Sequence, residues 1–135
     1  MILLPPDIRA KLLANGAECG PDHAPLLKLF NPIGAATWLA SELYEDGDTL
    51  FGLADLGFGC PEMGTFSLTE IVSVRLPYGL RIERDLYFRA RFGLTVYADA
   101  ARIVSRVTED ERLPATAARA RELNRNTEIP PDPDG

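Results

Sequence analysis

Two apolar segments, residues 36–44 and 49–56, flank a short polar stretch and restrict how this chain can fold. The stretch, residues 45–48, reads Glu-Asp-Gly-Asp. An Asp-Gly pair between apolar segments favours a β-hairpin, because glycine readily adopts the positive φ that the turn requires. The first arm is open to a second interpretation as a helix, since Leu39 and Leu43 are four residues apart. We expect the hairpin.

Two further strands are predicted from local patterns. Residues 26–30 form a short apolar run that ends at Asn31-Pro32. Residues 80–88 alternate between apolar and polar side chains, which is typical of a strand with one buried face. Arg84 falls on the apolar face of this predicted strand.

Three helices are predicted from their start and stop signals. The first begins after Pro5 and ends at Asn15-Gly16. The second begins with a capping box, Ser67 to Glu70, and must end before Pro77. The third covers residues 95–107, where apolar side chains recur at helical spacing. A further helix is expected after Pro114.

These elements predict an α+β fold: a small, mostly antiparallel sheet of about four strands packed by two or three helices. The length of 135 residues fits a single globular domain, which we assign to residues 1–107. Residues 108–135 form a polar extension, and its proline-rich end is expected to be disordered. The start of the chain does not resemble a signal peptide, and no apolar run is long enough to cross a bilayer. With only two cysteines, we expect a cytoplasmic protein.

Charge is distributed unevenly along the chain. No lysine or arginine occurs between Lys28 and Arg75. The same stretch holds seven acids: Glu42, Glu45, Asp46, Asp48, Asp55, Glu62 and Glu70. With a formal net charge of -6, binding to nucleic acid is not expected, because phosphate contacts rely on lysine and arginine. We expect instead a protein partner with a basic surface.

Residues 55–64, with the sequence DLGFGCPEMG, are the most unusual segment. Glycines in such a loop allow the backbone to approach a ligand closely, and two carboxylates flank them. The same sequence also suits a strand exit with tight turns. The candidate binding residues are Glu42, Asp55, Gly57, Gly59, Glu62, Glu70 and Arg84.

Arg84 needs an explanation if its strand face is buried. An isolated buried charge is very costly, so either Asp55 or Glu62 would pair with it, or Arg84 lies at a sheet edge and extends to water. Converging carboxylates would suit Mg²⁺ or Ca²⁺, but their spacing matches no calcium loop. His23, the only histidine, and Cys60 lack evident catalytic neighbours. The sequence therefore predicts no catalytic residue, metal or cofactor.

Several stretches, taken in order, carry a resemblance to a known family. They are IRAKLLANG at residues 8–16, LKLFNP at 27–32 followed by ATWL at 36–39, FGLADLGFGCPEMG at 51–64, SLTE at 67–70 and IERD at 82–85. Over roughly residues 2–105 the chain resembles the bacterial family named domain of unknown function 2958. The family prefers PELG where this chain has PEMG at 61–64. The resemblance implies an association with proteobacterial plasmids and other mobile elements, and it implies no catalytic residues.

The sequence leads to one functional hypothesis and two alternatives. The first is a cytoplasmic, non-catalytic accessory protein of a mobile element that acts through protein contacts. The second is a counter-defence protein whose acidic surface mimics DNA. The third is a metal-assisted hydrolase that depends on the carboxylates of Asp55 and Glu62, which would need tuned pKa values for acid–base work.

Overall fold

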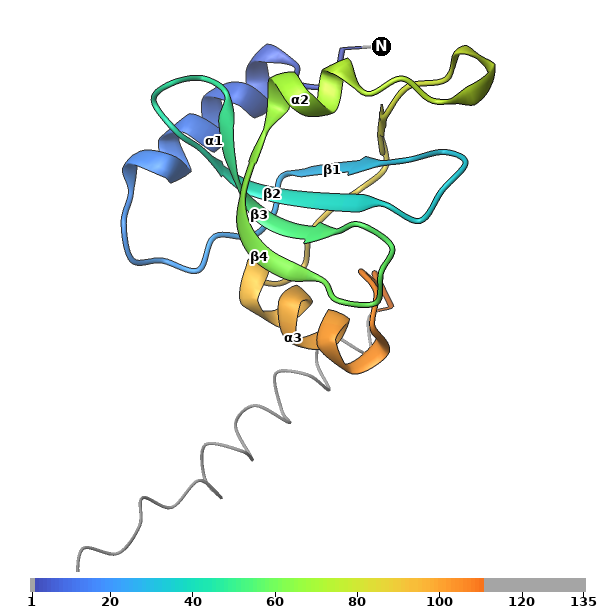
Figure 1. Cartoon of the computed structure of the whole chain (residues 1–135). Helices are drawn as coiled ribbons and strands as arrows, with labels where there is room; N and C mark the ends of the chain where they lie inside the picture. The colour runs from blue at the N-terminus through green and yellow to red at the C-terminus, as the bar shows by residue number, and fades with distance from the viewer. Residues whose placement is uncertain (1, 111–135) are drawn as a thin grey trace, which may run out of the picture.

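The computed structural model describes residues 2–110, and an antiparallel sheet of five strands lies at its centre (Figure 1). The strands are β1 (Leu27–Phe30), β2 (Thr37–Leu43), β3 (Thr49–Asp55), β4 (Glu62–Ser67) and β5 (Glu83–Arg84). They follow the order β4-β3-β2-β1-β5, and every neighbouring pair is antiparallel. The predicted α+β class is confirmed, with five strands rather than about four.

Helices cover both faces of the sheet. They are α1 (Pro6–Ala17), α2 (Leu68–Ser73) and α3 (Leu94–Val104), together with a 3₁₀ turn, η1 (Pro77–Gly79). Helices α1 and α2 lie on one face and α3 on the other (Figure 1). No helix in the described residues is both long enough and apolar enough to span a membrane.

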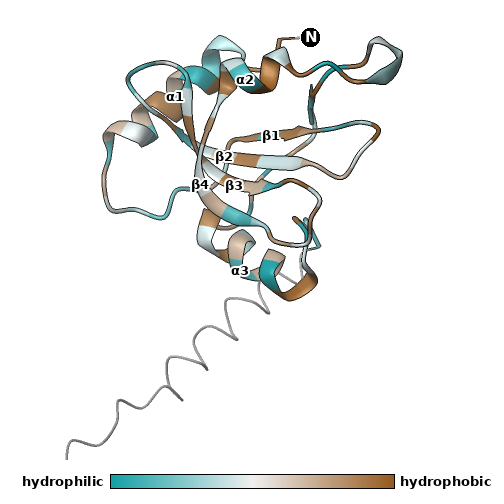
Figure 2. Cartoon of the chain, viewed as in Figure 1, coloured by the Kyte–Doolittle hydropathy of each residue, from teal (hydrophilic) through white to brown (hydrophobic). Residues whose placement is uncertain are grey.

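Two hydrophobic clusters separate these layers. Leu12 of α1 and Ile71 of α2 pack with apolar residues of the upper sheet face, including Trp38. On the lower face, Leu39 and Leu53 pack with residues of α3. In the hydropathy colouring, apolar residues occur in the central strands and in parts of each helix (Figure 2).

The hairpin predicted around residues 45–48 is present as β2 and β3. The carboxylate of Asp46 accepts hydrogen bonds from the backbone N–H groups of Asp48 and Thr49, both at 2.8 Å. Gly47 has a φ of 71°, in the left-handed region that the turn requires. The alternative of a helix in the first arm is wrong.

A glycine allows β2 and β3 to approach each other where the ladder is irregular. The register shifts between Ala40 and Glu42, opposite Gly52. A Cβ atom on Gly52 would lie 1.8 Å from the carbonyl oxygen of Leu39. Gly64, its neighbour across β3 and β4, has no atom within 4 Å of the corresponding position. The two paired glycines therefore differ sharply in their tolerance of a side chain.

We expect Gly52→Ala to lower the free energy of unfolding by about 3 kcal/mol, because the added methyl group meets rigid backbone. Gly64→Ala is the matched control and should leave stability within about 0.5 kcal/mol of wild type. Urea denaturation followed by circular dichroism measures both. Equal stability of the two variants would contradict the proposed close approach.

Helix α2 begins where the capping box predicted it. The hydroxyl oxygen of Ser67 accepts a hydrogen bond from the N–H of Glu70 at 3.2 Å. Asp48, from the hairpin turn, accepts hydrogen bonds from the Ser67 hydroxyl at 2.6 Å and from the N–H of Thr69 at 2.7 Å. The Ser67 hydroxyl is the largest cause that lowers the pKa of Asp48 below 3.8, and the Thr69 groups add to it.

This arrangement predicts a loss of stability in acid. Because the pKa of Asp48 is lower in the folded chain, its contribution is present above about pH 3.8 and is lost as pH falls through the folded value. Asp48→Asn should therefore unfold with a shallower dependence on pH between 4 and 2 than wild type. Glu45→Gln, which removes a carboxylate of the same turn but none of the bonds made by Asp48, is the control. Thermal melts across this range test the prediction, and parallel slopes for Asp48→Asn and wild type would exclude it.

The strand predicted over residues 80–88 is mostly wrong. Only Glu83 and Arg84 pair with β1, and the segment before them forms η1 and a loop. Within it, Ile82 and Phe88 are buried as predicted, whereas Leu86 is 48% exposed. Because β1 has only four residues, it gives β5 little to pair with.

Three further details complete the comparison with the sequence. Strand β4 was not predicted. Helix α1 continues past Gly16 to Ala17, and α3 starts at Leu94 after Gly93, so Thr95 lies in its first turn. The N–H and hydroxyl of Thr95 bond to Asp22. The helix predicted after Pro114 lies outside the described residues.

Candidate functional site

The β3–β4 loop, residues 56–61, is fixed by the last residue of β3. Asp55 is buried, with 3% of its surface exposed. One carboxylate oxygen accepts a hydrogen bond from the N–H of Gly57 at 2.9 Å, and the other accepts one from the N–H of Val107 at 3.1 Å. The carboxylate therefore joins the strand end, the loop and the segment after α3.

This loop carries exposed apolar side chains. Phe58 is 84% exposed and Leu56 is 55% exposed. The β1–β2 turn lies beside the loop: a Cβ atom on Gly57 would be 3.0 Å from the Cβ of Ala35. That turn adds Ile33, which is 50% exposed. We call Ile33, Leu56 and Phe58 the loop patch.

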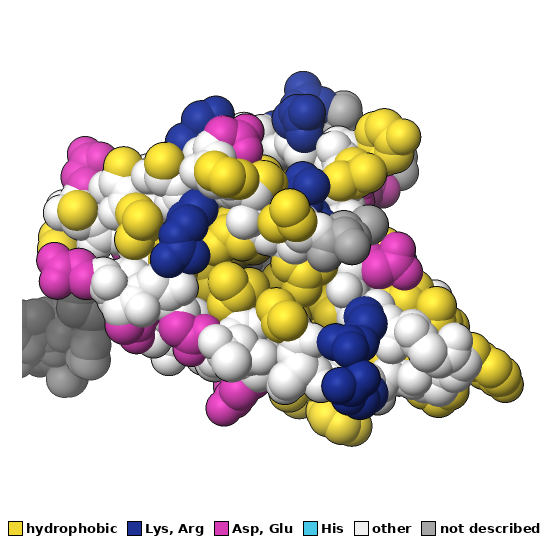
Figure 3. Space-filling model, turned by 90° about the horizontal axis from the view of Figure 1, so that it is seen from above, with side chains coloured by type: hydrophobic (Ala, Val, Ile, Leu, Met, Phe, Trp, Pro, Cys, Tyr) yellow, Lys and Arg dark blue, Asp and Glu magenta, His cyan; other side chains and the backbone are white. Residues whose placement is uncertain are grey.

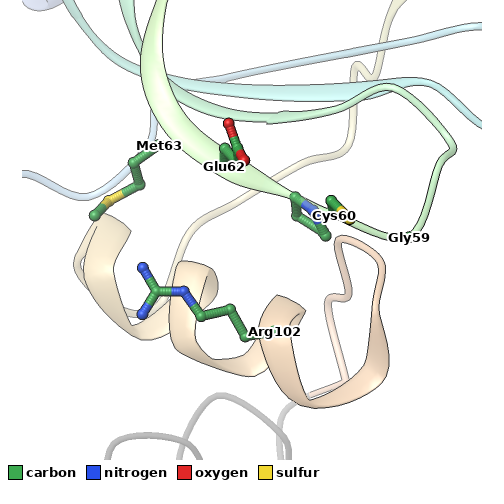
Figure 4. Close-up of a pocket in the computed structure, with 6 residues that line it drawn as sticks. Gly59, Cys60, Glu62, Met63 and Arg102 are labelled. Atoms are coloured by element: carbon green, nitrogen blue, oxygen red, sulfur yellow. The ribbon is translucent and has the colours of Figure 1, made fainter.

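A hollow of about 520 Å³ lies between the start of β4 and α3. It is lined by Gly59, Cys60, Pro61, Glu62, Met63 and Arg102. Figure 4 shows the side chain of Met63 pointing towards α3, whereas that of Glu62 points away from it, to the other side of the sheet. The guanidinium of Arg102 bonds to Asp99 at 3.3 Å, and Cys60 is an exposed free thiol. Glu62 and Arg102 are therefore turned in different directions although both line the hollow.

The acids of the segment without lysine or arginine do not form one row. Four lie at the end of the sheet formed by the β2–β3 turn and the start of α2: Glu45, Asp46, Asp48 and Glu70. Asp46 and Asp48 use their oxygens within the turn and the cap. Arg9 of α1 also reaches this end and donates to the carbonyl of Gly47 at 3.4 Å.

The remaining acids lie elsewhere. Asp55 and Glu62 are at the opposite end of the β3–β4 hairpin, about 20 Å away for a seven-residue strand. Glu42 lies in β2, opposite Phe51. Seen from above, both acidic and basic side chains surround an apolar centre, with several Asp and Glu side chains at the lower left (Figure 3). The structure thus brings Asp55, Gly57 and Glu62 close together but separates them from Glu70.

Arg84 lies at an edge of the sheet. Its strand β5 and strand β4 occupy opposite edges, with β1, β2 and β3 between them. The Arg84 side chain donates to the carbonyl of Ile2 at 3.3 Å. An ion pair between Arg84 and either Asp55 or Glu62 is therefore not formed, and the alternative of an edge position agrees with the structure.

Other features of the described residues bear on chemistry. No group of three or more His, Cys, Asp or Glu side chains in residues 2–110 is arranged to hold a metal ion. Lys28 pairs with Asp85 at 3.5 Å and with Glu109, so the last cation before the acidic stretch is neutralised within the chain. The arginines at positions 112, 119, 121 and 125 lie outside the described residues.

Sequence reasoning missed Phe58 and Leu56. The glycines and the two flanking carboxylates of residues 55–64 do not by themselves indicate an exposed aromatic side chain. One feature of the sequence does indicate exposure of Phe58: it lies between Gly57 and Gly59, in a turn too short to bury an aromatic side chain. Both glycines have positive φ, at 90° and 81°.

The fold and the loop define a small α+β protein with an exposed apolar patch at one end of an antiparallel sheet. Residues 3–108 match the family described as "Protein of unknown function (DUF2958)". The chain belongs to that family, which confirms the resemblance seen in its sequence. No curated protein and no solved structure matches the chain.

Asp55→Ala should lower the free energy of unfolding by about 1–3 kcal/mol, because it leaves two N–H donors without their acceptor. It should also speed hydrogen exchange at the amide of Val107, 52 residues away. Glu62→Gln, an exposed acid at the start of β4, is the control. Urea denaturation and amide exchange measure the two effects, and unchanged exchange at Val107 would refute the link.

Proposed function

We propose that this protein is a small, cytoplasmic, non-catalytic accessory protein of a mobile genetic element that binds a protein partner with a basic surface. The binding region is the loop patch of Ile33, Leu56 and Phe58. The observation that carries the proposal is the 84% exposure of Phe58 on a loop that a buried carboxylate fixes.

An exposed aromatic side chain on a fixed loop is suited to binding a protein. Burying a phenylalanine side chain contributes about 1.5–3 kcal/mol, and aromatic anchors dominate many interfaces. A loop that is already ordered avoids much of the entropy cost of binding. The bonds from Asp55 to Gly57 and Val107 supply that order before any partner arrives.

Charge supports the choice of partner. Strands β2, β3 and β4 and helix α2 contain no lysine or arginine. Glu62 is exposed at the end of the loop, and Glu45 and Glu70 are exposed at the other end of the sheet. A basic partner would be attracted by this part of the molecule, and the attraction should weaken with salt.

The two alternative functions have less support. A DNA mimic needs acids spaced along one surface, and here they lie at two ends of a strand with two of them engaged in a turn. A hydrolase using Asp55 would need a free carboxylate, and both of its oxygens accept backbone N–H groups. The mobile-element setting rests on the family and not on the geometry.

The proposal predicts a partner whose capture depends on Phe58. The full chain, immobilised, should retain a basic protein from a lysate of the organism that carries the gene. Phe58→Ser should reduce that capture at least tenfold, because it removes the anchor. Tyr87→Ser is the matched control: Tyr87 is 89% exposed but follows β5, at the opposite edge of the sheet.

Both variants should melt at the wild-type temperature. Recovery of the same proteins by wild type and Phe58→Ser would contradict the proposal. Capture of a partner that stays bound in 0.5 M salt and carries a net negative charge would also contradict it, since the expected attraction is between opposite charges.

A further inference from the structure

Strand β4 forms one edge of the sheet, and its outer side is regular. The register with β3 runs without a shift from Thr49 opposite Ser67 to Ala54 opposite Glu62. No other strand of residues 2–110 pairs with its outer side. A six-residue edge of this kind can accept another strand.

The pairing shows which residues of β4 face outwards. The N–H of Leu68 donates to the carbonyl of Asp48 at 2.9 Å, so these two residues form a hydrogen-bonded pair. Such pairs alternate along an antiparallel ladder, so Phe66, Gly64 and Glu62 turn their backbone groups towards β3. Met63 and Thr65 therefore direct their N–H and C=O groups outwards.

The two edges of the sheet differ in how they are protected. Strand β5 has only two residues, both of them charged, Glu83 and Arg84. Short length and charge are common ways to prevent an edge from pairing. Strand β4 has no lysine, no proline and no bulge, and its single charged residue, Glu62, is its first. Within residues 2–110, one edge of the sheet is thus protected and the other is left open.

The side chains around β4 indicate what could pair with it. On the face that carries α2, a Cβ atom at Gly64 would have no neighbour within 4 Å, so a large side chain opposite it has room. Glu62 lies on the same face at one end, and Glu70 in the first turn of α2 lies at the other end. On the opposite face, Met63 is 38% exposed beside the hollow next to α3.

We propose that β4 binds an extended segment of the partner protein as an added antiparallel strand. The segment carries a lysine or arginine at positions i and i+4, a large apolar residue at i+2, and β-branched residues between them. Positions i, i+2 and i+4 share one face of a strand, so both cations face the acidic ends while the apolar side chain covers Gly64. The inference rests on the proposed function and specifies how the basic partner is recognised.

The probe is the peptide acetyl-Thr-Lys-Val-Phe-Val-Lys-Thr-amide, whose palindromic sequence presents the same side chains in either strand direction. In the ¹⁵N-labelled full chain without peptide, the amides of Met63 and Thr65 should exchange with solvent much faster than those of Gly64 and Phe66. Adding peptide should shift the Met63 and Thr65 resonances and slow their exchange. Shifts confined to another part of the molecule would overturn the proposal.

Two control peptides separate backbone pairing from charge. In an antiparallel arrangement, which every strand pair of this sheet adopts, the two valine amides face β4. Methylating both keeps every side chain but removes these donors, and it should abolish binding. Replacing both lysines by glutamate should weaken binding about fivefold or more, because two opposite-charge pairs are lost. Equal affinity of the methylated peptide would exclude antiparallel strand addition.

Variants of the protein itself also test backbone pairing at β4. Thr65→Pro removes an outward N–H and no bond to β3, whereas Thr65→Val keeps that donor and a strand-forming side chain. Only Thr65→Pro should lose the peptide. If the Thr65→Pro variant unfolds, binding of the methylated peptide to the wild-type protein tests strand addition instead. Protection of Met63 and Thr65 that rises with protein concentration, without peptide, would mean that a second copy occupies the edge, and would overturn the proposal.

The two proposals fail in different ways. If Phe58→Ser abolishes capture from the lysate and Thr65→Pro leaves it intact, the loop patch stands and strand addition falls. If neither variant changes what is captured, the proposed function falls as well.

Discussion

The structure depends on the buried carboxylate of Asp55. A carboxylate removed from water is costly unless hydrogen bonds replace its hydration, and here two backbone N–H groups do so. Those donors come from Gly57 in the next loop and from Val107, which follows α3. One side chain therefore holds the loop in place and connects it to the segment that follows α3. The exposed Phe58 has a defined position because of this interaction.

Asp48 has a comparable role at the other end of β3. It joins the β2–β3 turn to the start of α2, as Asp55 joins the β3–β4 loop to the segment after α3. Two of the seven acids in the stretch without lysine or arginine therefore stabilise the fold by accepting hydrogen bonds, and Asp46 does so within the turn. Asp46 is also exposed, and bonds from neutral hydroxyl and N–H groups lower its pKa, so it stays charged beside the exposed acids Glu45, Glu62 and Glu70. The same carboxylates can therefore stabilise the fold and contribute to the negative charge that a partner meets.

Features set by neighbouring residues could be predicted from the sequence, and features set by distant contacts could not. The turn at Asp46-Gly47 and the cap at Ser67 each depend on a few adjacent residues, and both were found. The sequence does not predict strand β4, because Gly64 and its polar neighbours give no apolar alternation. Its pairing with β3 determines its structure. The alternation over residues 80–88 was real, but β1 is too short to pair with all of it. The bond between Asp55 and Val107 spans 52 residues and leaves no local signal.

The relative size of the interactions decides what the candidate site contributes. An exposed ion pair is worth about 0–1 kcal/mol, whereas burying one phenylalanine side chain contributes about 1.5–3 kcal/mol. Each added backbone hydrogen bond contributes about 0.5–1.5 kcal/mol net. Affinity should therefore come mainly from Phe58 and the open edge of β4, and the exposed acids should govern which partners approach and how fast. The acidic stretch that first distinguishes the sequence would then select the partner, while apolar and backbone contacts hold it.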